Sequence, residues 1–168
     1  MTVVAAADMP DLLTLYASSQ PGKLAVIDDR PGADVVAWTY ARLEAEANRL
    51  ANALASLGVG PGEKVIWCGP NSPQVAAIVN ATRKLGAVGV PLNYRLTAEE
   101  AGFIVTHSDA CAAYVDAEYA HLIPIPHGER AGHLRHVLVY GGTARAGMLG
   151  EDLVALPRRH ARRLPHGR

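Results

Sequence analysis

The sequence has little charge, little cysteine and no long apolar run, and each shortage excludes a class of protein. Only 19% of its 168 residues are charged, while 49% are hydrophobic. This balance excludes compositional disorder and lets the chain bury one sizeable core. Apolar stretches such as residues 76–81 and 86–92 are far shorter than the roughly 20 residues that a membrane-spanning helix needs. We therefore expect one globular domain without a transmembrane segment.

Two further shortages concern compartment and redox chemistry. No basic residue precedes the small apolar run of residues 1–8, whereas a secretory signal needs a positively charged flank, so a cytoplasmic location is expected. The only cysteines, Cys68 and Cys111, each lie within an apolar, strand-like segment. A buried thiol is the ordinary state there and a disulfide the rarer one. Both are therefore predicted to be core residues.

The formal charge of zero conceals an uneven distribution. Residues 1–129 hold 8 basic and 14 acidic side chains, whereas residues 130–168 hold 8 and 2. The positive excess ends in residues 158–168, which contain five arginines, no acid and no apolar period. This composition predicts a basic disordered tail behind a folded domain of residues 1–157. Such a tail can bind nucleic acid or an acidic membrane through charge, but we expect it to be solvated and without a nucleic-acid partner.

The amino-terminal third predicts a helix, a hairpin and a second, longer helix. Pro10 suits the first turn of a short amphipathic helix that ends before a Pro-Gly pair. The inward face of this helix would comprise Leu12, Leu13 and Tyr16. Two β-prone runs, residues 24–28 and 35–38, flank a second Pro-Gly pair and predict a hairpin. Apolar residues then recur every three or four positions between a Thr39 cap and a Gly58 stop, which predicts a long helix.

The middle of the chain alternates strands with helices. Buried strands are predicted at residues 64–68, 87–92 and 111–115. Ser72, followed by Pro73, caps the first intervening helix, and Thr97 with Glu100 forms a capping box for the second. Strands joined by crossover helices lie parallel with right-handed connections, so the fold class is α/β. Beyond Asp116 the pattern weakens to a helix at 117–122, a strand at 136–140 and a helical turn at 151–155.

Five short strings carry more than secondary structure. They are residues 38–43 with 48–51, residues 69–73, residues 83–93, residues 94–100 and residues 134–139. Their order and spacing resemble the core motifs of adenylate-forming enzymes, the acyl-CoA synthetases and the adenylation domains of peptide synthetases. The resemblance covers roughly residues 10–156. It implies a partial amino-terminal subdomain of that fold, in which a mostly parallel sheet is flanked by helices and preceded by a helix and a hairpin.

In the family that the chain resembles, the chemistry lies further along. A Thr/Ser/Gly-rich loop ending in Lys wraps the ATP phosphates, and a mobile carboxy-terminal domain carries the catalytic lysine. The full-length family uses ATP, Mg and coenzyme A, but we expect no cofactor, no metal and no catalytic residue in these 168 residues. The chain is thus expected to be truncated, and an arginine-rich end suits a frameshift in a GC-rich gene.

Four sets of residues invite functional readings, each with a structural alternative. Asn93 and Arg95 follow a predicted parallel strand, where ligands bind in open α/β sheets, and the resemblance implies contacts to coenzyme A there; otherwise they form a turn and an exposed cation. Residues 140–147 are glycine-rich but lack a lysine, so loop turns are expected rather than a phosphate site. The other sets are His121, His127, His133 and His136, expected in loops rather than on zinc, and Asp28, Asp29 and Asp34, expected on the hairpin surface.

Three functions therefore remain open. The first is a carboxylic-acid or fatty-acid CoA ligase fragment that is inactive alone. The second is a noncatalytic interaction module that pairs with itself or a full-length paralogue through apolar faces left bare. The third is an independent small nucleotide-binding protein, which ATP binding in a calorimeter would favour.

Overall fold

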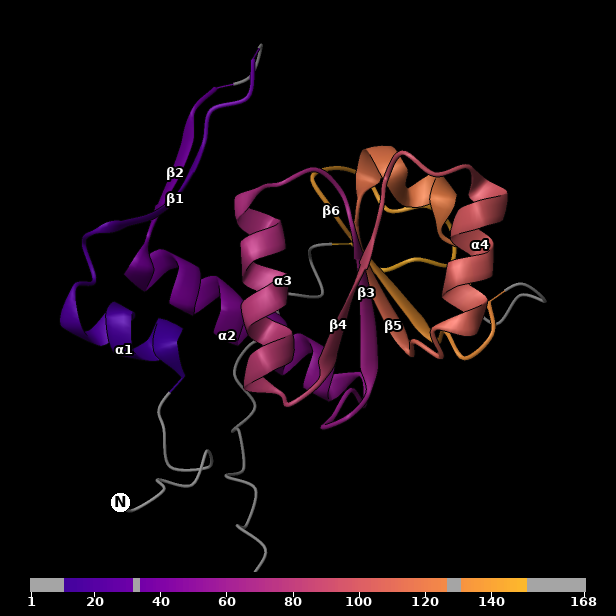
Figure 1. Cartoon of the computed structure of the whole chain (residues 1–168), viewed down its shortest axis with the longest axis horizontal. Helices are drawn as coiled ribbons and strands as arrows, with labels where there is room; N and C mark the ends of the chain where they lie inside the picture. Colours follow the sequence, from indigo (N-terminus) through magenta and orange to yellow (C-terminus); the bar gives the residue numbers. More distant parts are fainter. Residues whose placement is uncertain (1–10, 32–33, 127–130, 151–168) are drawn as a thin grey trace, which may run out of the picture.

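A four-stranded parallel sheet forms the centre of the molecule. The computed structural model describes residues 11–31, 34–126 and 131–150. Within these residues the strand order is β4-β3-β5-β6, and each neighbouring pair is parallel (Figure 1). The strands are β3 (Lys64–Cys68), β4 (Val88–Leu92), β5 (Ala112–Asp116) and β6 (His136–Tyr140). The predicted α/β class is confirmed.

Helices cover both faces of this sheet, as crossover connections require. On one face α2 (Tyr40–Ser56) and α3 (Pro73–Lys84) pack around Val65, Ile78 and Leu138. On the other face α4 (Ala98–His107) and the 3₁₀ helix η2 (Ala117–Leu122) enclose a second core. Three layers result. The predicted caps are confirmed, because the side chains of Thr39, Ser72 and Thr97 each accept a backbone hydrogen bond at the start of a helix.

Strand burial confirms one prediction and corrects another. Val65, Ile66 and Cys68 of the central β3 are fully buried, as their continuous apolar run predicts. The predicted burial of the next strand is wrong, because most of β4 is exposed and Val88 is 49% exposed. The reason is position: β4 has β3 on one side and no strand on the other among the described residues. Both cysteines are buried and free, as predicted.

The amino-terminal helix buries less than its pattern suggested. Helix α1 (Leu12–Ser19) is capped by Asp11, whose carboxylate accepts from the Leu13 N–H; Pro10 lies outside the described residues. Only Leu13 of the predicted inward face is buried, whereas Leu12 and Tyr16 are 52% and 41% exposed. Leu13 packs with Trp38 and is the apolar side chain of α1 that joins the core.

The predicted hairpin is present. Strands β1 (Leu24–Asp28) and β2 (Val36–Thr39) pair antiparallel and extend away from the three-layered body (Figure 1). Val26 and Trp38 join the small core beneath the hairpin, which α2 and α3 complete with Leu43, Ala47 and Ala77. Ile27, on the opposite side of β1, is 60% exposed.

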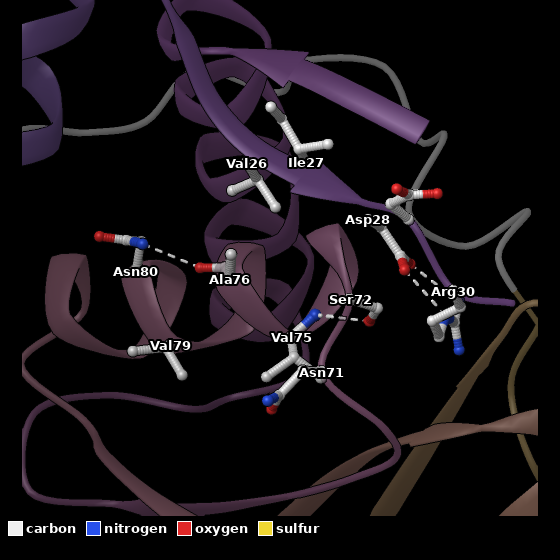
Figure 2. A pocket seen from close by; sticks show the side chains of 11 residues that line it. Val26, Ile27, Asp28, Arg30, Asn71, Ser72, Val75, Ala76, Val79 and Asn80 are labelled. Atoms are coloured by element: carbon white, nitrogen blue, oxygen red, sulfur yellow. Dashed lines mark hydrogen bonds and ion pairs between the residues drawn. The ribbon is translucent and has the colours of Figure 1, made fainter. Parts of the chain in front are cut away.

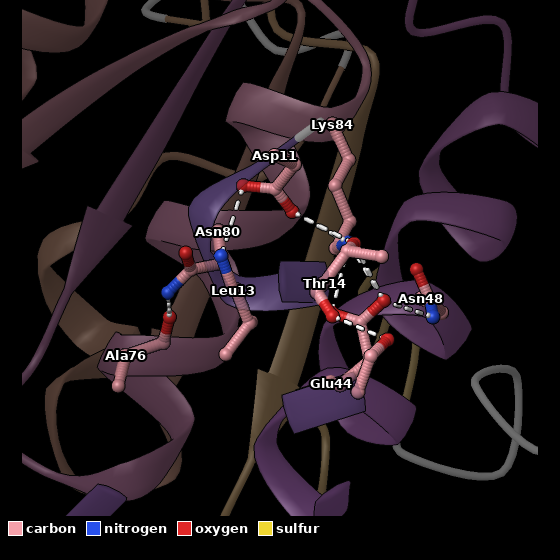
Figure 3. Close-up of polar contacts among 9 residues, drawn as sticks. Asp11, Leu13, Thr14, Glu44, Asn48, Ala76, Asn80 and Lys84 are labelled. Carbon is pink, nitrogen blue, oxygen red and sulfur yellow. Dashed lines mark hydrogen bonds and ion pairs between the residues drawn. The ribbon is translucent and has the colours of Figure 1, made fainter. Parts of the chain in front are cut away.

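Lys84 ties the three helices of this region together (Figure 3). Its ammonium, at the end of α3, lies 2.7 Å from Asp11 Oδ2 and 2.9 Å from Glu44 Oε2, and it donates to Thr14 Oγ1 at 2.9 Å. The Lys84 side chain is only 12% exposed. Asn48 donates to the Glu44 carboxylate at 3.0 Å. Helices α1, α2 and α3 thus share one half-buried cation.

The chain closes the β6 edge of the sheet. After β6 it returns so that Leu149 pairs parallel with Leu138. The Val139 N–H donates to the Leu149 carbonyl at 2.8 Å, and the Leu149 N–H donates to the Val137 carbonyl at 2.7 Å. The predicted helical turn at 151–155 and the basic tail at 158–168 lie outside the described residues. Within the described ranges no helix is long and apolar enough to cross a membrane.

The shared cation predicts a measurable loss of stability. Lys84→Met keeps the length of the side chain but leaves two half-buried carboxylates, Asp11 and Glu44, without their cation. We expect the free energy of unfolding to fall by about 2 kcal/mol in urea titrations followed by circular dichroism. Lys64→Met is the control, because it removes only an exposed 3.5 Å pair with Asp109 and should cost less than about 0.5 kcal/mol. Equal losses would contradict a special role for Lys84.

The same cluster makes stability depend on pH. Burial raises the pKa of Asp11, but the hydrogen bond and charge of Lys84 and the bonds from Leu13 and Thr14 outweigh it and hold this pKa below its ordinary 3.8. The unfolded chain therefore takes up this proton first, so the contribution of Asp11 is complete above pH 3.8 and is lost as pH falls through the folded pKa. Asp11→Asn should destabilise the protein near neutral pH and cost progressively less below pH 3.8. A cost that does not change with pH would show that the charge of Asp11 is irrelevant.

Candidate functional site

The carboxyl ends of the four strands meet at one edge of the sheet. Along the chain, β4 joins one side of β3 and β5 joins the other, so the strand order reverses at β3. Ligands of open α/β sheets bind in the crevice at such a reversal. The first residues beyond the strands here are Gly69, Asn93, Ala117 and Gly141. This edge is therefore the candidate site.

Asn93 and Arg95 lie at this edge, as predicted, and both are exposed. The Asn93 side-chain oxygen accepts from the Arg95 N–H at 3.0 Å and so forms a turn directly before the Thr97 cap. The Arg95 guanidinium lies 4.9 Å from the ring centre of Tyr94, which contacts Tyr119 at a ring distance of 4.9 Å. The turn that was expected as the structural alternative is therefore present, and the Arg95 guanidinium is exposed to solvent.

Tyr140 and Asp116 occupy the crevice itself. The Tyr140 ring stacks on Tyr114 at 4.6 Å between centres, and Tyr140 is 2% exposed. Burial raises the pKa of the Tyr140 phenol strongly, and the nearby Ser72 hydroxyl offsets only part of this effect. No described residue lies in hydrogen-bonding geometry with the Tyr140 hydroxyl. Burial, with the Asp116 charge added, likewise raises the pKa of Cys68 to about 12, so this thiol stays protonated and is unsuited to nucleophilic catalysis.

The glycine-rich segment after β6 forms turns. Gly141 and Gly147 both have positive φ, at 73° and 83°, and the Met148 N–H donates to the Arg145 carbonyl at 3.0 Å. A Cβ on Gly142 would collide with the Ala117 side chain. The segment brings Leu149 back beside β6. These contacts give the segment a structural role, as expected.

A cleft of 560 Å³ adjoins the candidate site between β1 and α3 (Figure 2). Val26, Val75 and Val79 line its apolar part, and Asn71 and Ser72 line its polar end. The remaining lining residues are Ile27, Asp28, Asp29, Arg30, Ala76 and Asn80.

The hairpin contributes to this cleft an ion pair between the buried Asp28 and the half-exposed Arg30, which sequence reasoning missed. Asp28, predicted on the surface, is only 8% exposed; that prediction is wrong because Asp28 points toward α3 and binds Arg30. Arg30 donates through Nε to Asp28 Oδ1 and lies through Nη2 against Oδ2, both at 2.9 Å. This hydrogen bonding raises the pKa of Arg30 against the opposing effect of burial, and the charges of Asp28 and Asp116 add to the rise. No sequence pattern signals that the hairpin reaches the sheet edge.

The described histidines are not grouped into a metal site. His133 Nδ1 lies 3.2 Å from an Asp109 carboxylate oxygen, and His121 Nδ1 lies 3.0 Å from the Glu118 carbonyl. His136 begins β6, and His127 lies outside the described residues. In the part of the chain that the structure describes, no three His, Cys, Asp or Glu side chains are grouped to hold a metal ion.

Comparison with known proteins places this fold in a family. The model of the family described as AMP-binding enzyme matches residues 13–160. The chain belongs to this family. A 3-hydroxybenzoate–CoA ligase of Aromatoleum sp. (strain CIB) is 39% identical over 117 residues, which are 70% of this chain and 22% of that ligase. This AMP-binding enzyme chain therefore spans about a fifth of the length of that relative.

Solved structures agree with the family assignment. An anthranilate CoA ligase in complex with anthranoyl-AMP superposes with a TM-score of 0.69 at 26% identity, covering 90% of this chain and 29% of the ligase. A fatty acyl CoA synthetase of Mycobacterium tuberculosis gives 0.69 at 32% identity, covering 86% and 26%. The predicted resemblance to the amino-terminal part of acyl-CoA synthetases is confirmed.

The close packing at the crevice predicts a coupled pair of positions. A Cβ on Gly69 would overlap the Tyr140 hydroxyl and lie 3.1 Å from Asp116 Cβ. We expect Gly69→Ala to lower the free energy of unfolding by about 1–3 kcal/mol, and Tyr140→Phe to recover part of that loss by removing the obstructing oxygen. Tyr140→Phe alone should be neutral or stabilising, because no described residue, the nearby Ser72 included, meets the Tyr140 hydroxyl in hydrogen-bonding geometry.

Gly102→Ala is the control for this series, since Gly102 lies on a half-buried part of α4 and a Cβ there meets nothing within 4 Å. It should raise stability by up to about 1 kcal/mol. Chemical denaturation of the four variants measures each effect. Strictly additive losses at Gly69 and Tyr140 would disprove the coupling.

Proposed function

We propose that this chain supplies the amino-terminal scaffold of an acid–CoA ligase, an enzyme that activates a carboxylic acid with ATP and transfers the acyl group to coenzyme A. The family match over residues 13–160 carries the proposal. Two relatives of this chain are named as CoA ligases of 3-hydroxybenzoate and of anthranilate, which are carboxylic acids, and this supports a carboxylic acid as the substrate. ATP, Mg and coenzyme A are then the cofactors of the complete enzyme.

Within this proposal, Asn93 and Arg95 contact the coenzyme A side of the ligase. Their support is position: both lie just beyond the carboxyl end of β4, where this fold class binds ligands, and both are exposed. The hydrogen bond from the Arg95 N–H to the Asn93 side-chain oxygen holds the backbone of Arg95. The ring of Tyr94 supports the Arg95 guanidinium from one side. A guanidinium fixed in this way can donate to a carbonyl or phosphate oxygen.

We further propose that these 168 residues complete no adenylation alone. A phosphate-binding loop needs backbone amides and a cation directed at a polyanion. The glycine-rich segment after β6 provides neither a lysine nor a following helix among the described residues, and it is folded back against β6. The chain should therefore bind no ATP in a calorimeter.

A second candidate function is a noncatalytic interaction module. Exposed apolar side chains favour it, because Ile27 is 60% exposed on the hairpin and Val88 is 49% exposed on β4. Pairing with a second copy or with a full-length paralogue would cover such surfaces. Sedimentation at increasing concentration separates the two proposals, since a scaffold without partners stays monomeric or aggregates irregularly.

A chimera tests the leading proposal. The matching amino-terminal region of the Aromatoleum 3-hydroxybenzoate–CoA ligase is replaced by residues 13–150 of this chain, and thioester formation is measured. We expect activity, because the scaffold is shared. In the active chimera, Arg95→Ala should raise the KM for coenzyme A by about tenfold, equivalent to one lost charge-assisted contact of about 1.4 kcal/mol, without changing the KM for ATP.

Arg83→Ala is the matched control, because Arg83 is an exposed arginine in the last turn of α3, away from the carboxyl ends of the strands. Its kinetics should equal those of the unmodified chimera. A folded chimera without activity would overturn the scaffold proposal. An active chimera in which Arg95→Ala changes nothing would remove only the assignment of Arg95.

A further inference from the structure

The cleft beneath the hairpin lies along an unpaired strand edge. Strand β1 pairs with β2 on one side and, within the described residues, with no strand on the other. Five consecutive residues of this segment, 26–30, line the cleft, whereas no residue of β2 does. An open strand edge presents backbone N–H and C=O groups that can pair with another chain.

The floor of the cleft suits the side chains of an added strand. Val26 and Asp28 point from β1 toward α3, and Ile27 points away (Figure 2). A strand beside β1 would extend the hairpin sheet over α3, where it would meet Val75, Ala76 and Val79. Because alternate side chains of a strand face the same side, every second residue of the added segment would contact this apolar floor.

The charge at the rim selects the occupant. Arg30 and Asp28 neutralise each other through their two contacts of 2.9 Å. Asp29 is exposed, lies on the rim and has no ion pair with a described residue. One negative charge therefore remains uncompensated, and it favours a basic side chain in the occupant.

We propose that this cleft binds an extended segment of a partner protein by strand addition to β1. The segment alternates apolar side chains, which contact α3, with polar ones, and it places a lysine or arginine beside Asp29. Main-chain hydrogen bonds to β1 supply the register, and the α3 floor and Asp29 supply the selectivity. This site is independent of the ligase proposal, because it uses neither Asn93 nor Arg95.

Nuclear magnetic resonance of the isotope-labelled full chain tests the proposal. The probe is a blocked peptide of alternating valine and threonine with one central lysine. We expect amide shifts that saturate and are confined to residues 26–30 and 71–80. The same peptide with a central proline, which cannot donate a backbone hydrogen bond, should bind about tenfold more weakly. Absence of saturable shifts, or shifts elsewhere only, would overturn the proposal.

Two variants test the geometry and the charge separately. Val79→Trp fills the apolar floor and should weaken binding about tenfold, whereas Gln74→Trp, on the same helix but outside the lining, should not. Asp29→Lys changes only an exposed charge, so it should preserve the fold and reverse the preference between the lysine peptide and its glutamate counterpart. An unchanged preference would refute the role of Asp29. Concentration-dependent shifts without peptide would replace the proposed partner with a second copy of the chain.

Discussion

The parallel pairing of β3 with both of its neighbours is the constraint on which the rest of this structure depends. Parallel strands cannot be joined by tight turns, so α3 and α4 must cross over the sheet, and they do so on opposite faces. Two consequences follow from this one arrangement. The central strand becomes fully enclosed, and every loop that leaves a strand at its carboxyl end is delivered to the same edge, which makes that edge the place where chemistry can gather.

Much of this framework was predictable because its signals are local. The caps Thr39, Ser72 and Thr97 and the stop at Gly58 are set by hydrogen bonding and backbone freedom within one turn of helix, so they can be read without knowledge of the neighbours. The exposure of β4 was not predictable in the same way. An apolar run indicates that a strand can be buried, but the place of that strand in the sheet decides whether it is.

The same distinction between local signals and contacts formed on folding applies to the residues of the candidate site. The position of Asn93 and Arg95 at the sheet edge was predictable because the residue after a parallel strand has a known location in the fold; their ligand contacts remain a proposal. Two other contacts join segments that are adjacent only after folding: Lys84 is shared by two carboxylates, and Gly69 lies close to Tyr140. The burial of Asp28 beside Arg30 depends instead on which face of β1 is covered. The family resemblance suggested which ligands to look for at this site, whereas the side-chain contacts became visible only in the folded chain.

The return of the chain along β6 makes the two edges of the sheet different. Leu149 uses the outer backbone groups of β6, whereas those of β4 face no described strand. Pro91, within β4, lacks a backbone N–H and so weakens that edge as a template for unselective pairing. Among the described residues, the β6 edge is therefore covered by the returning chain at Leu149, whereas the β4 edge is open and carries a proline that disfavours the addition of a further strand.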